Sequence, residues 1–171
     1  MKRTLWLDRH FPSAPDPGLL PAILERLEGT PARLESKLKN IPEELLTLKI
    51  SGKWSIKEEV GHLSDLEALS AGRVEELAVG AAELMAADMS NKKTHEAGHN
   101  DTSLADLLQY FRGQREALVK RIRTLSDEQL QHSALHPRLK IPMRVVDLAL
   151  FFAEHDDHHL AAIQEILSHN K

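Results

Sequence analysis

The sequence predicts an all-α protein that folds as a four-helix bundle. Apolar residues recur with the 3.6-residue period of an amphipathic helix over four long stretches. Strand signals are nearly absent, because aromatic residues make up 4% of the chain and alternation of apolar and polar residues never lasts. The length of 171 residues fits one domain, 1–171, that buries its own core.

The first helix is expected to follow an irregular, proline-rich N-terminal leader over residues 1–17. An apolar stripe then runs through about 19–38, interrupted at Gly29, Thr30 and Pro31. Thr30 is a good N-cap residue and Pro31 suits the first turn of a restarting helix. We therefore expect a broken or kinked first helix.

Capping signals place the next two helices. Ser55, with Glu58 three residues on, predicts the start of a helix that continues to about residue 79. Ser103, with Asp106, predicts the start of the third helix, which ends near a short separate turn in "LSDEQL". The last helix is expected from Pro142 to about Ser168, roughly 40 Å at ~1.5 Å per residue.

Composition limits the function classes. The net charge of -4 and the lack of a basic face argue against a nucleic-acid partner. No apolar run approaches the ~20 residues of a membrane span. Asp8, Arg9 and His10 interrupt what would otherwise begin like a signal peptide, so we expect a cytoplasmic protein. The absence of cysteine excludes disulfides, thiolate catalysis and zinc fingers, which leaves histidine and carboxylate as metal ligands, and the chain has ten histidines.

The stretch "EHDDHHLAAI", residues 154–163, concentrates histidines and carboxylates in the last helix. His155 and His159 are one turn apart, about 40° on a helical wheel, on the same face as the apolar stripe. His158 lies at the edge of the stripe and Asp157 points away. A single inward histidine is usually a satisfied core residue, but two at this spacing in a bundle can bind one ion, so both interpretations stay open from this helix alone.

A third histidine in the second helix favours the metal. His62 borders the apolar stripe, followed by Leu66 and Leu69 at one-turn spacing. If the second and fourth helices face each other, His62, His155 and His159 give three neutral imidazoles and leave a coordination position open for water or substrate, as in catalytic sites.

A zinc-protease pattern, "HEAGH" at 95–99, lies in the wrong context. The motif needs a long amphipathic helix, whereas this one sits in the polar connection 88–102 and contains Gly98. That connection is predicted to be a plain polar link, with a lid that offers Thr94, His99 or Asn100 to a substrate as the alternative. In "HPRLKIP", Arg138 is a candidate for a substrate carboxylate, although a solvated loop arginine is commoner.

Several segments together resemble the DinB family (DinB/YfiT-like metalloenzymes). They are "GKWSIKEEVGHLSDLE" and, about ninety residues later, "AEHDDHHLAAI", with "WLDRHF" and "ERLEGTPARLE" near the N-terminus. The resemblance implies an up-down-down-up bundle, often dimeric, with a three-histidine site for a divalent metal. By motif position, its ligands fall on His62, His155 and His159.

The resemblance also implies classes of activity. Members bind nickel, zinc and other ions, and include thiol S-transferases, an isomerase that uses a small thiol, and many proteins described as metal-dependent hydrolases. We therefore expect a divalent ion, nickel or zinc first and iron or manganese as alternatives, a small-molecule substrate, a possible low-molecular-weight thiol, and a homodimer. Asp65, Glu58 and His158 are the candidate catalytic residues, which would either orient the metal ligands or transfer a proton. The alternative function is a non-catalytic metal-binding or interaction bundle.

Overall fold

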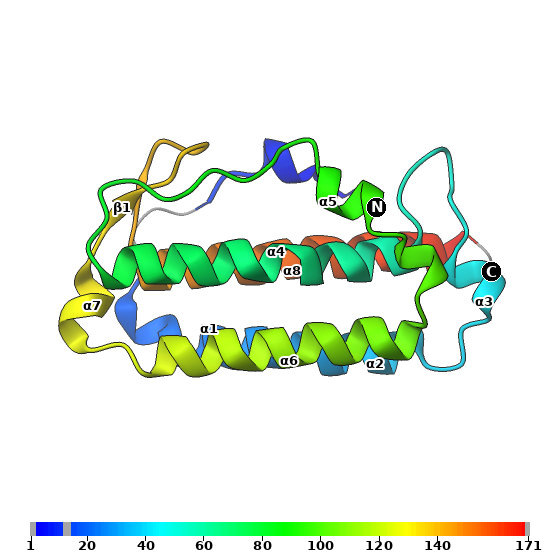
Figure 1. Ribbon diagram of the computed structural model, residues 1–171, viewed down its shortest axis with the longest axis horizontal. Helices are drawn as coiled ribbons and strands as arrows, with labels where there is room; N and C mark the ends of the chain where they lie inside the picture. The colour runs from blue at the N-terminus through cyan, green and yellow to red at the C-terminus, as the bar shows by residue number, and fades with distance from the viewer. Residues whose placement is uncertain (1–2, 12–14, 170–171) are drawn as a thin grey trace.

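The computed structural model describes residues 3–11 and 15–169, so parts of the predicted leader, 1–2 and 12–14, lie outside the described residues. Four long helical segments form the bundle (Figure 1), as predicted. The elements in chain order are η1 Trp6–Asp8, η2 Pro17–Leu19, α1 Leu20–Glu28, α2 Thr30–Leu38, α3 Glu43–Leu46, α4 Ile56–Ala78, α5 Lys92–Glu96, η3 His99–Asp101, α6 Leu104–Arg123, α7 Asp127–Gln131, β1 Ala134–Leu135, β2 Pro142–Met143 and α8 Val145–Ser168.

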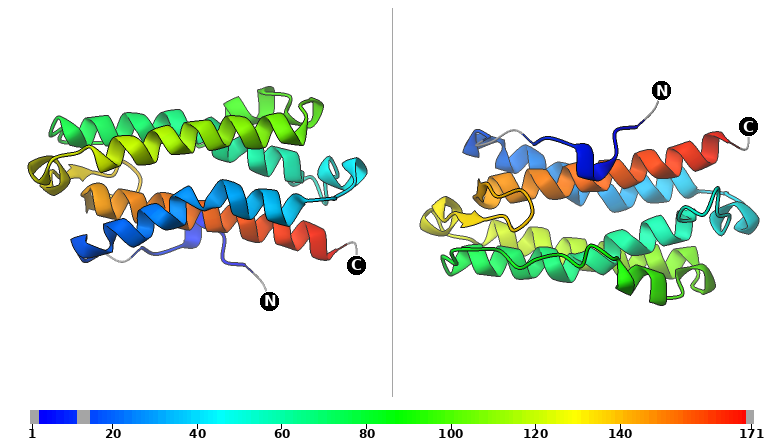
Figure 2. Two further views of the ribbon diagram at one scale, coloured as in Figure 1. Left: turned by 90° about the horizontal axis from the view of Figure 1, so that it is seen from below. Right: turned by 90° about the horizontal axis from the view of Figure 1, so that it is seen from above.

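The arrangement is up-down-down-up. The α1–α2 segment and α8 run in one direction, and α4 and α6 run in the other (Figure 1). Helix α4 packs against α6 and α8, while α1 packs against α8 and α6. The connection 79–103 returns along the bundle beside α4, and the N-terminal segment crosses α8 on the same side (Figure 2). Both segments therefore cover the face where α4 meets α8.

The predicted break in the first helix lies between α1 and α2. Pro31 has no N–H to donate to the Leu27 carbonyl, and that carbonyl instead accepts a hydrogen bond from Arg115 Nη1 at 3.2 Å. The predicted role of Thr30 as N-cap is wrong: Gly29 occupies that position, and Thr30 Oγ1 donates to Asp156 Oδ2 at 2.7 Å. The side chain serves a contact between helices because its hydroxyl faces α8.

The helix starts predicted at Ser55 and Ser103 are confirmed. Ser55 forms a capping box with Glu58 at the start of α4, and Ser103 accepts the N–H of Asp106 at the start of α6. The short turn in "LSDEQL" is α7, capped by Ser126. Among the described helices, none is long and apolar enough to cross a bilayer.

The last helix begins three residues later than predicted. Pro142–Met143 pairs antiparallel with Ala134–Leu135, a short hairpin that the sequence did not indicate. Helix α8 starts at Val145 because Asp147 accepts the backbone N–H of the N-cap residue Arg144 at 2.9 Å. The hairpin brings its turn, residues 136–141, beside the bundle.

The connection after α4 carries two short helices, α5 and η3, where we expected a plain polar link. Helix α5 ends at Glu96, and Gly98 adopts a left-handed conformation with φ +66° before η3. His95 lies exposed on α5, whereas His99 is buried beyond the break. The two histidines of the "HEAGH" pattern therefore do not share a helix face, which agrees with the rejection of a protease motif.

A buried polar layer divides the apolar core. One apolar cluster surrounds Leu27, Leu77 and Leu148, and the other surrounds Leu34, Val60 and Ile163. Between them lie four buried side chains from four helical segments, here called the central polar layer: Thr30, Glu67, Arg115 and Asp156. The predicted metal ligands lie beside this layer.

Candidate metal centre

Helices α4 and α8 bring together the three histidines predicted from the sequence. One ring nitrogen from each of His62, His155 and His159 lies within 4.8 Å of the other two. The Nε2 atoms of His155 and His159 are 3.0 Å apart, and the ring centroid of His62 lies 4.8 Å from that of His159. The antiparallel packing of the two helices produces this geometry, so one ion can contact all three imidazoles.

A hydrogen-bond chain orients His62. Its Nδ1–H donates to Thr94 Oγ1 at 2.9 Å, and that hydroxyl donates to Asp65 Oδ2 at 2.9 Å. Because Nδ1 carries the proton in this arrangement, Nε2 keeps a lone pair for a cation. The predicted orienting role of Asp65 thus has a physical path, through a threonine contributed by α5.

Glu59 holds His159 in the same manner. His159 Nδ1 lies 2.5 Å from Glu59 Oε2, and both side chains are buried. Burial raises the pKa of Glu59 to about 8 and lowers the pKa of His159 to about 3, because it disfavours the charged form of each group. Within the described residues, Glu59 has no lysine or arginine in ion-pair distance. A divalent cation on Nε2 would supply the missing positive charge, so this pair fits a metal centre.

The three imidazoles are neutral at neutral pH. Burial lowers the pKa of His62 to about 3 and lowers that of His155 well below its ordinary value, and the neighbouring histidines lower both further. Neutral imidazole is the form that ligates metals. The donor set, three nitrogens without thiolate, suits a borderline divalent ion such as zinc or nickel.

Two tryptophans flank the histidines. The Trp54 ring lies 4.5 Å from the His62 ring and is stacked over His159 at 6.2 Å. On the other side, Trp6 from η1 meets His155 edge to face at 4.8 Å. These aromatic walls exclude water from part of the site, which strengthens electrostatic interactions there.

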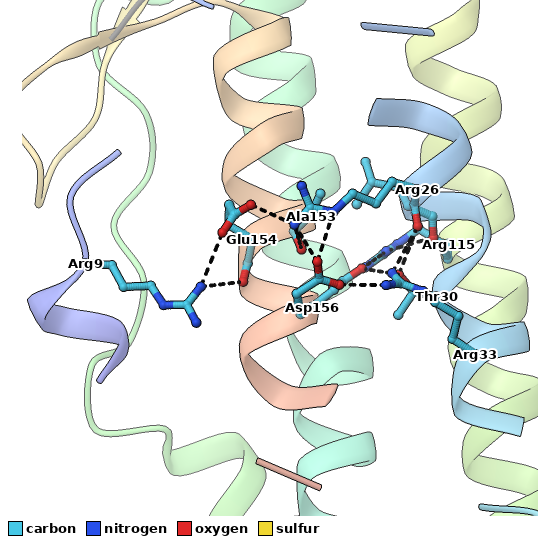
Figure 3. Close-up of polar contacts among 10 residues, drawn as sticks. Arg9, Arg26, Thr30, Arg33, Arg115, Ala153, Glu154 and Asp156 are labelled. Atoms are coloured by element: carbon cyan, nitrogen blue, oxygen red, sulfur yellow. Dashed lines mark hydrogen bonds and ion pairs between the residues drawn. The ribbon is translucent and has the colours of Figure 1, made fainter. Parts of the chain in front are cut away.

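The carboxylates of "EHDDHH" face away from the histidines, toward other helices. Glu154 binds Arg9 and Arg26, and Asp156 accepts hydrogen bonds from Arg115 and Thr30 (Figure 3). Asp157, expected to point to solvent, pairs with Arg26 and Arg33 while remaining half-exposed. One face of α8 therefore carries the histidines, and the others anchor the helix in the bundle.

A cavity of about 280 Å³ opens beside His155 between α4 and α8. It extends from His155 past apolar side chains to the turn of the β1–β2 hairpin, where Arg138 lines it together with Pro137 and His136. Arg73 of α4 lines the same end. A small molecule in this cavity would lie next to a ligand of the proposed metal.

A family model described as the DinB superfamily matches residues 26–163. That range contains His62, His155 and His159. The chain belongs to the DinB superfamily.

A solved structure with the same architecture is described as "YfiT from Bacillus subtilis is a probable metal-dependent hydrolase with an unusual four-helix bundle topology". The match has a TM-score of 0.78 at 20% sequence identity and covers 92% of this chain and 91% of the other. At this identity the likeness confirms the bundle topology of this DinB-superfamily protein. No curated protein matches its sequence.

Two candidate catalytic residues of the DinB-superfamily protein have other contacts. Glu58 accepts the Ser55 backbone N–H at 2.9 Å and pairs with Lys49 at 2.7 Å, and these contacts lower its pKa. His158 faces the N-terminal segment, where Arg3 Nη1 lies 2.5 Å from its Nε2. Burial, together with the neighbouring His159 and Arg3 side chains, lowers the pKa of His158 to about 3.

The predicted substrate-binding residues separate into two groups. His99 Nε2 donates to Asp65 Oδ2 at 2.8 Å, and Asn100 Oδ1 accepts from Ser55 Oγ at 2.6 Å. Both contacts attach the connection to α4, and neither residue lines the cavity. Arg138 does line it.

Sequence reasoning missed Glu59, and a signal for it existed. Glu59 precedes His62 by three residues, which places the two on neighbouring lines of one helix face. Its bond to His159 joins α4 to α8, however, and depends on how the helices pack. Trp6 gave no comparable signal, because its contact with His155 arises where the N-terminal segment crosses α8.

The close approach of η3 to α4 depends on Gly61, and we predict that Gly61→Ala displaces His99. An added Cβ would lie 2.3 Å from Cγ of the His99 ring. Alanine gains about 1 kcal/mol over glycine in a helix, but the overpacking costs about 1 to 3 kcal/mol and weakens the contact of His99 with Asp65. Urea denaturation should show net destabilisation by about 1 kcal/mol.

Gly113→Ala is the matched control for this substitution. Gly113 lies in α6 with no atom within 4 Å of an added Cβ, so the same change should stabilise the protein by about 0.5 to 1 kcal/mol. Equal stabilisation by both substitutions would contradict the tight contact.

Proposed function

We propose that this protein is a divalent-metal-dependent enzyme that acts on a small molecule, a hydrolase in the first place. The supporting observation is the arrangement of three neutral imidazoles in which the Nδ1 atoms of His62 and His159 are already engaged, by Thr94 and Glu59. Such an arrangement preorganises Nε2 atoms toward one ion. Three protein ligands leave a coordination position for a reactant, the pattern of catalytic rather than structural sites.

The roles of the chain's own residues follow from their contacts. His62, His155 and His159 would hold the ion, which when bound would polarise a substrate oxygen and lower the pKa of a coordinated water or thiol. Glu59 and Asp65 fix the ring orientations, Asp65 acting through Thr94. His155 faces both this site and the 280 Å³ cavity, so the cavity is where the substrate would lie.

A thiol S-transferase is the second candidate. A low-molecular-weight thiol would take the place of water, and the absence of cysteine in the chain is no obstacle because the thiol would come from the cofactor. The hydrolase is preferred because YfiT is described as a probable metal-dependent hydrolase. Nickel or zinc is the expected ion, with iron or manganese as alternatives, and a homodimer is the expected assembly.

The competing function is a non-catalytic metal-binding or interaction bundle. The same three imidazoles would then bind an ion without turning over a substrate. The cavity beside His155 argues for the enzyme, because a purely structural ion needs no adjoining space for a small molecule.

The metal content of purified protein tests the site. We expect wild type to carry about one divalent ion per chain, and His155→Ala to lose it, because two imidazoles bind far more weakly than three. His95→Ala, which changes an exposed histidine of the rejected protease motif, should retain the ion. Elemental analysis of the three proteins after identical purification provides the measurement, and equal metal content in all of them would overturn the assignment.

Turnover tests the enzyme. The metal-loaded protein is assayed with small carboxylic esters in water and, separately, with electrophiles and a panel of small thiols. Ester turnover that chelator abolishes supports the hydrolase, and turnover only with a thiol supports the transferase. If the loaded protein turns over neither class, the non-catalytic bundle is favoured.

A further inference from the structure

We propose that the cavity beside His155 binds a small carboxylate with an apolar body, whose carboxylate lies at the hairpin end, on Arg138 and His136, and whose reacting group lies toward the histidines. The position of the reacting group rests on the proposed function. The carboxylate site does not, because its residues are separate from the three imidazoles.

Three residues that line this cavity each carry a buried polar atom without a hydrogen-bond partner. In the described part of the chain, three buried side-chain atoms have no hydrogen-bond partner: Glu67 Oε2, His136 Nε2 and Arg138 Nη2. All three residues line the same cavity. Glu67 and His136 are themselves only 4% and 2% exposed. A buried polar atom without a partner costs about 1 to 3 kcal/mol, so a ligand that formed hydrogen bonds with these atoms would offset that cost.

The hairpin end offers donors for an anion. His136 Nδ1 accepts the backbone N–H groups of Arg138 and Leu139 at 3.2 and 3.1 Å, so the proton of the neutral ring is on Nε2, the unpartnered atom. Among the described residues, Arg138 has no carboxylate within ion-pair distance, and its guanidinium lies over the Phe151 ring at 6.0 Å. The His136 ring also contacts Phe151, with ring centroids 5.1 Å apart. A guanidinium N–H and an imidazole N–H could each donate to one oxygen of a carboxylate.

A second arginine makes this end more positive. Arg73 lines the cavity, is 3% exposed and donates through Nε and Nη2 to the Met85 carbonyl at 3.0 and 2.9 Å. Those are neutral contacts, which leave its charge available to attract an anion. The pKa values of Arg73, His136 and Arg138 are all lowered, in each case mainly by burial.

The length and the walls of the cavity define the body of the ligand. Lining residues on α4 run from Leu63, next to His62, to Arg73, roughly 15 Å along the helix at ~1.5 Å per residue. The walls between them are mostly apolar, with Leu66, Leu69 and Phe152 among them. A volume of about 280 Å³ is at the small end of ligand pockets, which span ~300 to 1,000 Å³. Glu67 Oε2, part-way along, would accept an N–H or O–H from the body.

Calorimetric titration of the metal-free protein with hexanoate, hexan-1-ol and hexylamine tests the proposal. We expect hexanoate to bind at least tenfold more tightly than the alcohol, and the amine to bind most weakly. Arg138→Gln should weaken hexanoate about tenfold and leave hexan-1-ol unchanged, since a charged hydrogen bond is lost. Lys140→Gln, which removes an exposed charge from the same turn, should change hexanoate affinity less than twofold.

Circular dichroism would check that each variant is folded. Arg138→Lys should bind hexanoate more tightly than Arg138→Gln does, because it keeps the positive charge. Equal binding of acid and alcohol, or equal effects of Arg138→Gln and Lys140→Gln, would overturn the proposal. Repeating the titration with zinc-loaded protein separates the two proposals. Hexanoate binding that needs zinc and ignores Arg138 would place the carboxylate on the ion and leave the proposed function intact. If hexanoate binding depends on Arg138 but the protein retains no metal, the carboxylate site in the cavity is supported and the proposed metal-dependent activity is contradicted.

Discussion

Replacing Arg115 by methionine is expected to destabilise the protein by about 3 to 5 kcal/mol. Arg115 is 2% exposed and donates to Asp156 (Figure 3). It also donates to Glu67, so one guanidinium neutralises much of the charge of two buried carboxylates. Methionine fills similar space, but it leaves these carboxylates without their cation and the Leu27 carbonyl without a donor. Urea denaturation followed by circular dichroism measures the loss.

Arg121→Met is the matched control on the same helix. Arg121 makes a two-bonded ion pair with Glu75, at 2.6 and 2.8 Å, but both side chains are exposed, so its loss should cost no more than about 1 kcal/mol. If the two variants lose similar stability, the central polar layer contributes no more than a surface pair.

The loss of unfolding free energy caused by Arg115→Met should also depend on pH. Burial already raises the pKa of Glu67 in the native state, against the opposing effect of Arg115, and removal of Arg115 raises it further. A native state that holds protons more tightly than the unfolded chain loses stability as the pH rises. The difference from wild type should therefore be smaller at pH 5.5 than at pH 8, and substitution of both carboxylates by apolar residues in the Arg115→Met background should recover part of the stability.

Glu59→Gln is expected to weaken metal binding about 10- to 100-fold while the protein stays folded. The glutamine can still contact His159 Nδ1, but it brings no negative charge to offset a divalent ion, and Glu59 is the group that holds that ring. Competition with a chromophoric chelator, using zinc as the probe, measures the dissociation constant.

Glu58→Gln provides the neighbouring control. Glu58 is the same type of residue and lies one position away, but its carboxylate caps α4 and pairs with Lys49, and glutamine is compatible with a capping box. Zinc affinity should change less than threefold. An equal loss in both variants would mean that net charge, and not the contact with His159, determines the affinity.

The fold and the candidate metal ligands can be predicted from the sequence because they depend on local periodicity. Ser55, Ser103 and Ser126 mark helix starts through contacts made within three residues. His155 and His159 share a face because four residues make about one turn. His62 needed an added assumption, that α4 faces α8, and the structure confirms that packing.

What the sequence did not predict are contacts between elements. Thr30 is a residue type that often caps helices, but its hydroxyl faces α8 and donates to Asp156 instead. The sequence predicts that Pro142 begins the last helix, whereas Pro142 pairs with Leu135 in the hairpin that carries His136 and Arg138 to the cavity. Both outcomes depend on packing across distant segments, for which local propensity is a weak guide.

The sequence by itself determined the helices, their buried faces and which three histidines are available for an ion, since each follows from the helical repeat. The tertiary structure alone decided which partner holds each ring. Thr94 and Asp65 orient His62, and Glu59 orients His159, because side chains far apart in the chain meet where the connection and α8 pack on α4. The tertiary structure also decided that Arg138 lines the cavity beside His155. The sequence does not distinguish this arginine from the others, because it reaches the cavity only where the hairpin turn packs against the bundle.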